Sequence, residues 1–356
     1  MNNMTTRRNF LAAGAAPFIL GAEDKAGVKA PILGEGEHRY EALHDWGRLP
    51  SRFRYGNTHG VVEDLERNIY IHHTVHASSE IPDTMVVFDR HGKFVRSWGK
   101  EFRGVAHGLH IRKEGREEFL YLTVNAANPK MTPQPAMQAV FLKTTLKGEI
   151  VWKIEGPPDI EAYRPGPDGA PKPYNPTNIA IAPGGDMYVG DGYGSYYVNQ
   201  YNSRGDYVRT FGGKGAEPGR LTEPHGIWVD TRAPEPVLVV ADRRNNRLQR
   251  FTLAGQHIDF IQGFRLPCHF HERRGDVVVP DLQGRVTLMD KDNRIIEHLG
   301  DSNPPNGQFP LRTAARDKFI PGQFICPHGA CFDRDGNIFV VEWVEVGRVT
   351  KLRKLA

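Results

Sequence analysis

The chain has 356 residues, of which 25% are charged and 39% hydrophobic, and its formal net charge at pH 7 is +4. Basic and acidic residues are mixed along the sequence, so there is no basic patch of the kind that binds nucleic acid. The chain contains three cysteines, and this odd number leaves at least one thiol outside any intramolecular disulfide. These features exclude nucleic acid as the partner of the chain.

Residues 1–22 differ in composition from the rest of the chain. Arg7 and Arg8 precede an apolar stretch at 12–20, and the small residues Gly21 and Ala22 follow it. This order is typical of a signal peptide, and the paired arginines before Phe-Leu resemble the twin-arginine type. The stretch is shorter than the roughly 20 apolar residues that a membrane-spanning helix needs. We therefore expect an export leader at 1–22, a single folded domain at 23–356, and a periplasmic or secreted protein without a stable membrane span.

The remaining chain consists of six copies of one unit, and four of the copies begin with His-Gly. The clearest copy covers 224–260 and has apolar runs PHGIWVD, VLVVADRRNNRLQRF and AGQHIDF, which are separated by turn-forming residues. Short strands rich in Val, Ile, Phe and Tyr, repeated about every 40–50 residues, are typical of a propeller. The copies begin, in chain order, at His59, His107, Thr177, His225, Cys268 and His328.

Three Pro- and Gly-rich segments interrupt the repeats, at 125–138, 156–175 and 302–324, and are expected to be ordered loops. The last copy has only three strands. Residues 40–47 resemble the outer strands at 94–99 and 207–212, so we expect them to complete the last blade. The sequence thus predicts an all-β fold, a six-bladed β-propeller whose last blade is closed by an N-terminal strand, with no unpaired inner edge.

The repeated histidines are candidates for a metal site. In a propeller blade the first strand lies nearest the axis, so the residues that begin these strands share one face of the ring. His107, His225 and His328 belong to blades two, four and six, which a six-fold ring separates by about 120°. Three histidines with an open fourth position are the ligand set of catalytic zinc, which acidifies a bound water or polarises an oxygen. The alternative is that His-Gly serves packing, because glycine permits close approach of backbones.

Other residues at the same mouth lie outside this three-fold set. His59 begins blade one and could be a fourth ligand or a pocket wall, and His72 and His73 follow the second strand of that blade. We expect these three histidines to contact substrate. Cys268 occupies the position that histidine holds in other copies, so it is a metal-site neighbour or a buried structural thiol.

The motifs PHGI-x-V-D and VADRRNNRLQRF are similar to the NHL repeat. Within the NHL propellers, the chain resembles peptidylglycine amidating lyase (peptidyl-α-hydroxyglycine lyase) over essentially its whole length after the leader. The resemblance implies a six-bladed propeller with a zinc ion held by one histidine from each of three blades and a calcium ion deeper in the channel. It also implies cleavage of a carbon–nitrogen bond in a C-terminal α-hydroxyglycine, which yields a peptide amide and glyoxylate.

The resemblance assigns roles to individual residues. It places the zinc ligands at His107, His225 and His328, and a calcium-binding carbonyl at Leu109. A Tyr in an Asp-Gly-Tyr segment matches Tyr193 and implies a catalytic base. An Arg in an Ala-Asp-Arg segment matches Arg243 and implies a partner for a substrate carboxylate.

Three positions depart from the family pattern. Thr74 stands near the place of a second active-site Arg, and Gly329 replaces an Asp that binds calcium. Residues 194–197 (Gly-Ser-Tyr-Tyr) lack the family's Asn and Arg. Because of Thr74 and residues 194–197, the family's substrate cannot be assigned to this chain from the sequence. Because of Gly329, calcium binding cannot be assigned either.

Three functions remain compatible with the sequence, each for a protein that we expect to be monomeric. The first is a zinc-dependent lyase or hydrolase acting on a small hydroxylated or carboxylated substrate or a peptide end. The second is a non-catalytic periplasmic propeller that binds a ligand or partner. The third is a calcium-dependent, lactonase-like hydrolase that uses oxygen ligands. Its ligands would be the mouth carboxylates, which could instead bind backbone amides in turns: Asp191, Asp242, Asp281 and Glu342.

Overall fold

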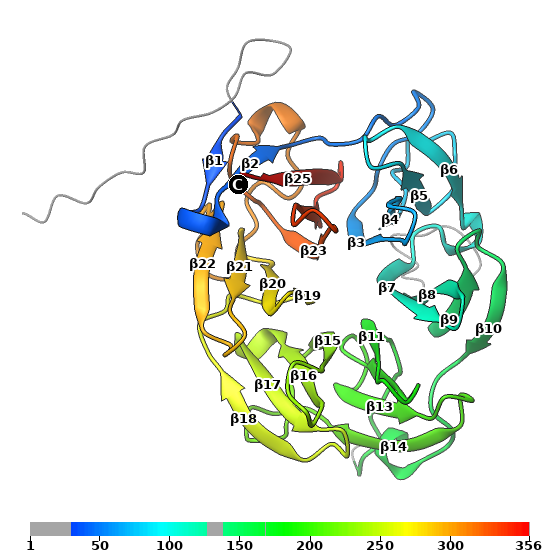
Figure 1. Ribbon diagram of the computed structural model, residues 1–356. Coiled ribbons are helices and arrows are strands. Elements are labelled where there is room, and N and C mark those ends of the chain that lie inside the picture. The colour runs from blue at the N-terminus through cyan, green and yellow to red at the C-terminus, as the bar shows by residue number, and fades with distance from the viewer. Residues whose placement is uncertain (1–29, 127–137, 168, 356) are drawn as a thin grey trace, which may run out of the picture.

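The computed structural model describes residues 30–126, 138–167 and 169–355. The predicted leader at 1–22 and most of the 125–138 segment lie outside these ranges. Within them, six antiparallel sheets surround a central axis, as predicted (Figure 1). Among the described residues, no helix has the length and apolar character needed to cross a bilayer.

Blades one to five each have four strands in simple order from the axis outward. Blade one has β3 (Thr58–Glu63), β4 (Ile69–His73), β5 (Met85–Phe88) and β6 (Phe94–Trp98). Blade two has β7 (Ala106–Glu114), β8 (Glu117–Val124), β9 (Val140–Thr145) and β10 (Ile150–Ile154). Blade three has β11 (Asn178–Ile181), β12 (Met187–Gly190), β13 (Tyr197–Tyr201) and β14 (Tyr207–Gly212).

Blade four has β15 (Pro224–Asp230), β16 (Val237–Asp242), β17 (Arg247–Thr252) and β18 (His257–Ile261). Blade five has β19 (His271–Arg273), β20 (Asp276–Asp281), β21 (Arg285–Met289) and β22 (Ile295–Leu299). The helical elements of the described chain are short 3₁₀ turns: η1 (Gly36–His38), η2 (Lys100–Phe102), η3 (Glu161–Tyr163), η4 (Arg243–Asn245) and η5 (Arg316–Lys318).

The two ends of the chain meet in blade six, which contains β23 (Pro327–Phe332), β24 (Ile338–Glu342) and β25 (Arg348–Lys354). The N-terminal strand β2 (Tyr40–Leu43) pairs antiparallel with β25 and completes this blade, which confirms the predicted closure (Figure 1). A further strand, β1 (Ile32–Leu33), pairs with β2 and was not expected from the sequence.

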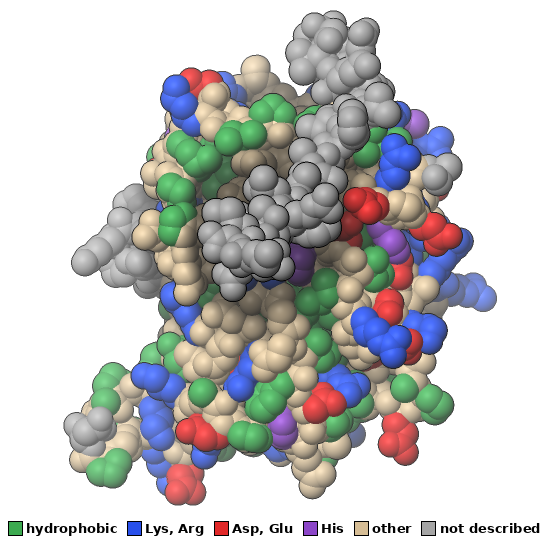
Figure 2. Space-filling model, turned by 90° about the vertical axis from the view of Figure 1, so that its left-hand side faces the viewer, with side chains coloured by type: hydrophobic (Ala, Val, Ile, Leu, Met, Phe, Trp, Pro, Cys, Tyr) green, Lys and Arg blue, Asp and Glu red, His purple; other side chains and the backbone are tan. Residues whose placement is uncertain are grey.

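The core of the ring lies between neighbouring blades. The middle strands are apolar runs because both of their faces pack against other blades, and all residues of β5 and β24 are buried. One cluster joins Val61 and Ile71 of blade one to Phe339 and Val341 of blade six. Outer strands such as β6 are mostly half-buried, and basic and acidic side chains alternate over the outer face in Figure 2.

Each His-Gly pair lies at an irregularity in its inner strand. The register of the inner strand with its neighbour shifts in β3, β7, β15 and β23, in each case at the His-Gly step. Such bulges re-aim a side chain, here the imidazole.

The glycine of the pair lies against the next blade. A Cβ on Gly108 would lie 2.6 Å from the carbonyl oxygen of Thr177, and one on Gly226 would lie 2.7 Å from that of Cys268. A Cβ on Gly329 would lie 2.5 Å from the carbonyl oxygen of His59. These distances leave no room for a side chain, so the packing role considered for His-Gly from the sequence applies at these three seams.

We expect Gly226→Ala to lower the free energy of unfolding by about 1–3 kcal/mol, because the added methyl group overpacks the seam between blades four and five. Urea denaturation measures this change. Gly184→Ala is the control, since Gly184 has an ordinary φ and no heavy atom within 4 Å of the added Cβ. Equal stability of the two variants would contradict the tight seam.

Candidate metal centre and cavity

Four histidines gather on the axis of the ring. The rings of His59, His107, His225 and His328 are buried, and five pairs of their centroids lie 4.5–5.0 Å apart. The structure thus brings together the three histidines expected from alternate blades. It also places His59 among them, with its Nδ1 3.4 Å from Nε2 of His328.

The three histidines from alternate blades are held in the same way. Nδ1 of His107 donates to the carbonyl of Thr177 at 2.6 Å, and Nδ1 of His225 donates to that of Cys268 at 2.8 Å. Nδ1 of His328 donates to the carbonyl of His59 at 2.9 Å. A carbonyl only accepts, so Nδ1 carries the proton and Nε2 keeps its lone pair. A fixed Nδ1–H is the arrangement that orients histidine ligands toward metals.

Burial keeps these imidazoles neutral. It lowers the pKa of His225 to about 4, and it lowers the pKa of His107 and of His328 well below the ordinary value. Neutral imidazole is the form that binds a metal ion. In the described part of the chain, the groups whose donor atoms lie within 4.8 Å of one another contain only histidine and cysteine: His59 with His107 and His328, and His225 with Cys268 and His328. This donor set suits zinc rather than calcium.

Cys268 lies beside the histidines, and its sulfur belongs to the group of donor atoms that includes His225 and His328. Burial raises the pKa of its thiol to about 11. Nη1 of Arg243 lies 3.7 Å from its sulfur. All three cysteines of the chain are buried and free of disulfides.

Tyr193 faces the histidines from the loop after β12. Its hydroxyl lies 3.1 Å from Nε2 of His107 and 3.2 Å from Nε2 of His225. The buried Asp191 carboxylate holds the loop by accepting from the amides of Asn175 and Ser195 and from the hydroxyl of Tyr163. Burial raises the pKa of Asp191 to about 7.

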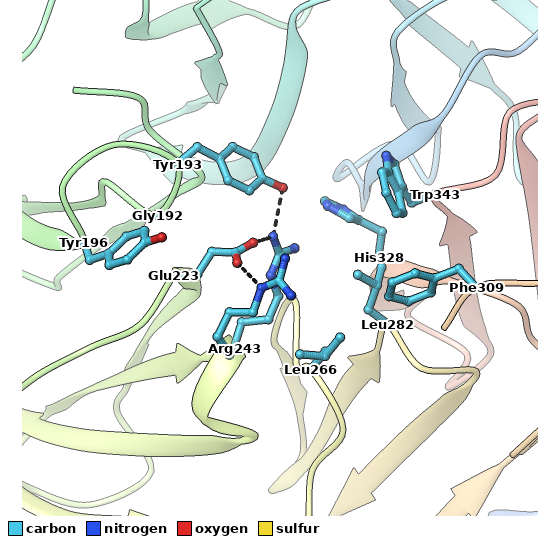
Figure 3. A pocket seen from close by; sticks show the side chains of 11 residues that line it. Gly192, Tyr193, Tyr196, Glu223, Arg243, Leu266, Leu282, Phe309, His328 and Trp343 are labelled. Carbon is cyan, nitrogen blue, oxygen red and sulfur yellow. Dashed lines mark hydrogen bonds and ion pairs between the residues drawn. The ribbon is translucent and has the colours of Figure 1, made fainter. Parts of the chain in front are cut away.

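A cavity of about 430 Å³ opens beside Tyr193 and His328. Figure 3 shows tyrosines and charged groups on one side of it and an apolar wall on the other. Its lining consists of Gly192, Tyr193, Tyr196, Glu223, Arg243, Arg244, Leu266, Leu282, Phe309, His328 and Trp343.

Arg243 begins η4, is 5% exposed, and forms an ion pair with Glu223. Its Nη2 also donates to the Tyr193 hydroxyl at 3.2 Å. Glu223 pairs in addition with Arg244. Sequence reasoning missed Glu223. The available signal was its place directly before Pro224-His225, which puts it at the mouth beside a predicted ligand.

The other predicted substrate contacts lie outside the cavity lining. His72 and His73 are 0% and 1% exposed. Nδ1 of His73 accepts from the amide of Val75 at 3.1 Å, whereas His72 has no hydrogen-bond partner in the described chain. His59 adjoins the cavity through His328. The Thr74 hydroxyl accepts from the amide of Asn57, so it ties the loop after β4 to the segment before β3.

The carboxylates considered for calcium bind protein donors, although Oδ1 of Asp281 has no hydrogen-bond partner in the described chain. Those of blades four to six each pair with an arginine of the neighbouring strand, namely Asp242 with Arg247, Asp281 with Arg285, and Glu342 with Arg348. Asp191 has the three donors given above. These residues stabilise their blades, and they do not fit an oxygen-lined calcium site.

Comparison with known proteins finds relatives of low sequence identity. No family model matches the chain. The chain is 28% identical over 275 residues to peptidyl-alpha-hydroxyglycine alpha-amidating lyase 1 of Drosophila melanogaster, covering 70% of this chain and 45% of that protein. It is 26% identical over 268 residues to peptidyl-glycine alpha-amidating monooxygenase B of Xenopus laevis, covering 72% of this chain and 27% of that protein. The chain therefore matches less than half of the length of these relatives.

Solved structures share the fold. A virginiamycin B lyase from Staphylococcus aureus has a TM-score of 0.54 at 14% identity, covering 89% of this chain and 100% of that one. A gluconolactonase from Xanthomonas campestris has a TM-score of 0.57 at 13% identity, covering 96% of this chain and 99% of that one. At these identities the likeness shows the fold alone. Sequence and fold together make this chain a six-bladed propeller that resembles the amidating lyases.

Proposed function

We propose that the chain is an exported, zinc-dependent lyase in which His107, His225 and His328 hold the metal ion. The observation that carries this proposal is the repeated bond from Nδ1 to the next blade, which leaves Nε2 unprotonated in three buried histidines whose ring centroids lie 4.7–5.0 Å apart. The proposed reaction is cleavage of a carbon–nitrogen or carbon–oxygen bond at a carbon that bears a hydroxyl group. Export follows the twin-arginine-type leader at 1–22.

When bound, zinc would supply the Lewis acidity that polarises a substrate oxygen. The chain's own residues then do two things. Tyr193, as the phenolate, is placed to accept the proton of the substrate hydroxyl and to pass it to the departing nitrogen or oxygen, because its oxygen faces the Nε2 atoms of both His107 and His225. Arg243 fixes the Tyr193 hydroxyl by donating to it. The cavity beside Tyr193 takes the rest of the substrate, a small molecule or the end of a peptide.

The name of the Drosophila relative specifies peptidyl-α-hydroxyglycine, and we carry over to this chain only the hydroxylated carbon. The reason is local, since the end of β4 offers two buried histidines, followed by Thr74, where the resemblance calls for a second arginine.

The metal site is tested by zinc analysis of the purified protein. We expect about one zinc ion per chain in the wild type and at least about tenfold weaker zinc affinity in His225→Ala, because one ligand is lost. Added zinc is also expected to raise the Tm of the wild type more than that of His225→Ala, because a ligand that binds only the folded state stabilises that state.

His91→Ala is the matched control, because His91 is exposed in the hairpin between β5 and β6. Zinc content that is low in the wild type and unchanged in His225→Ala would show that the site is wrong.

The role of Tyr193 is tested by Tyr193→Phe with a panel of α-hydroxy compounds, which includes esters and amides as well as a peptide that ends in α-hydroxyglycine. We expect kcat to fall by about 10²–10⁴-fold with zinc content unchanged, because the proton acceptor is lost. Tyr207→Phe, in outer strand β14 of the same blade, is the control. Binding of these compounds without turnover in the wild type would instead favour a non-catalytic propeller.

A further inference from the structure

We propose that Glu223 sets the charge preference of the cavity and makes it a site for uncharged substrates with an aromatic or apolar group. This inference rests on the proposed function, because it concerns the same cavity and names the class of substrate within it. A carboxylate on the substrate is, in this view, excluded rather than recognised.

The first argument is the hydrogen bonding of Arg243. A guanidinium has five N–H donors, and it binds a carboxylate bidentately through two donors on one edge. Both hydrogens of Nη2 are committed, one to Glu223 and one to Tyr193. Nη1 has one hydrogen directed at the Cys268 sulfur. Every edge that includes Nη2 is therefore blocked, and no bidentate edge remains for a substrate carboxylate.

The second argument is the placement of the Glu223 carboxylate. Glu223 is 8% exposed, lines the cavity, and binds Arg243 and Arg244 with its two oxygens (Figure 3). It neutralises the buried Arg243, whereas the Arg244 side chain is 60% exposed and is screened by solvent. An incoming carboxylate would meet a like charge at short range, which disfavours its ionised form.

The backbone at Glu223 supports a specific role. Its φ is +63°, in the left-handed region that non-glycine residues rarely occupy. Such a conformation persists only where the surroundings enforce it. Here it directs the carboxylate between the two arginines immediately before the ligand His225.

The opposite wall of the cavity selects for an apolar group. Phe309 and Trp343 meet edge to face at 5.9 Å, and Leu266 and Leu282 complete the wall (Figure 3). The Arg312 guanidinium stacks on Trp343, 3.6 Å from the ring centroid, and is absent from the cavity lining. An ester, lactone, amide or alcohol with an aromatic body satisfies both walls.

Methyl mandelate and mandelate test this inference, because both carry a phenyl ring and an α-hydroxyl group. They differ in one group, which is a neutral ester in methyl mandelate and a charged carboxylate in mandelate. Titration calorimetry on the purified protein is expected to give at least about tenfold tighter binding of the ester by the wild type. In Glu223→Gln the ratio of the two affinities should shift toward mandelate by at least about tenfold, because the like charge beside the substrate is removed and the charge of Arg243 is no longer neutralised.

Two further variants make this shift specific. Glu235→Gln removes the same charge from an exposed turn of the same blade and should leave the ratio unchanged. The double variant Glu223→Gln with Arg243→Gln removes both charges and should abolish the gain in mandelate binding. Tighter binding of mandelate than of the ester by the wild type, an unchanged ratio in Glu223→Gln, or binding of neither compound by the folded proteins would overturn the inference.

Zinc content and turnover, measured separately, distinguish this outcome from failure of the proposed function. A protein without zinc whose ligand ratio still depends on Glu223 would contradict the proposed function alone. A zinc-loaded, active enzyme whose ratio ignores Glu223 would contradict this inference alone. If Glu223→Gln does not fold, Arg243→Gln provides the reciprocal test, since an unpaired Glu223 should weaken mandelate binding further.

Discussion

The contact between one blade's His-Gly step and the next blade's carbonyl is the constraint on which the rest of the site depends. At three seams the glycine has no room for a side chain because that carbonyl is so close. The same carbonyl accepts a hydrogen bond from Nδ1 of the histidine in that step. Packing of the ring and orientation of the imidazoles are therefore one interaction. The two readings of His-Gly, a packing feature and a ligand, are not alternatives in this fold.

Much of the fold could be predicted from the sequence because its signals are local. Alternating apolar strands and Gly, Asp and Asn turns recur in every copy, and residues 40–43 carry the pattern of an outer strand. The meeting of His107, His225 and His328 followed from blade topology together with a family resemblance. The bulges that turn these side chains inward depend on strand register, which the sequence pattern does not reveal.

The polar surroundings of the site were harder to predict. Glu223 itself has a left-handed backbone conformation, which directs its carboxylate toward Arg243. The two residues are twenty positions apart in the chain. Nothing in a Thr-Glu-Pro segment announces that conformation. His72 and His73 were expected at the mouth from their position after a strand, yet the structure buries both side chains. The carboxylates at the ends of second strands likewise turn to their own blades, since an arginine stands beside each of three of them.

The closure of blade six makes one histidine of the centre depend on both ends of the chain. His328 lies on the inner strand of that blade, and its Nδ1 bond crosses to blade one. Blade six is complete only when β2, from the beginning of the chain, pairs with β25 from its end. The third imidazole thus stands in a sheet that the two ends of the chain build together. A deletion that removes β2 would expose an edge of the blade that carries His328, although β2 lies far from this histidine in the sequence.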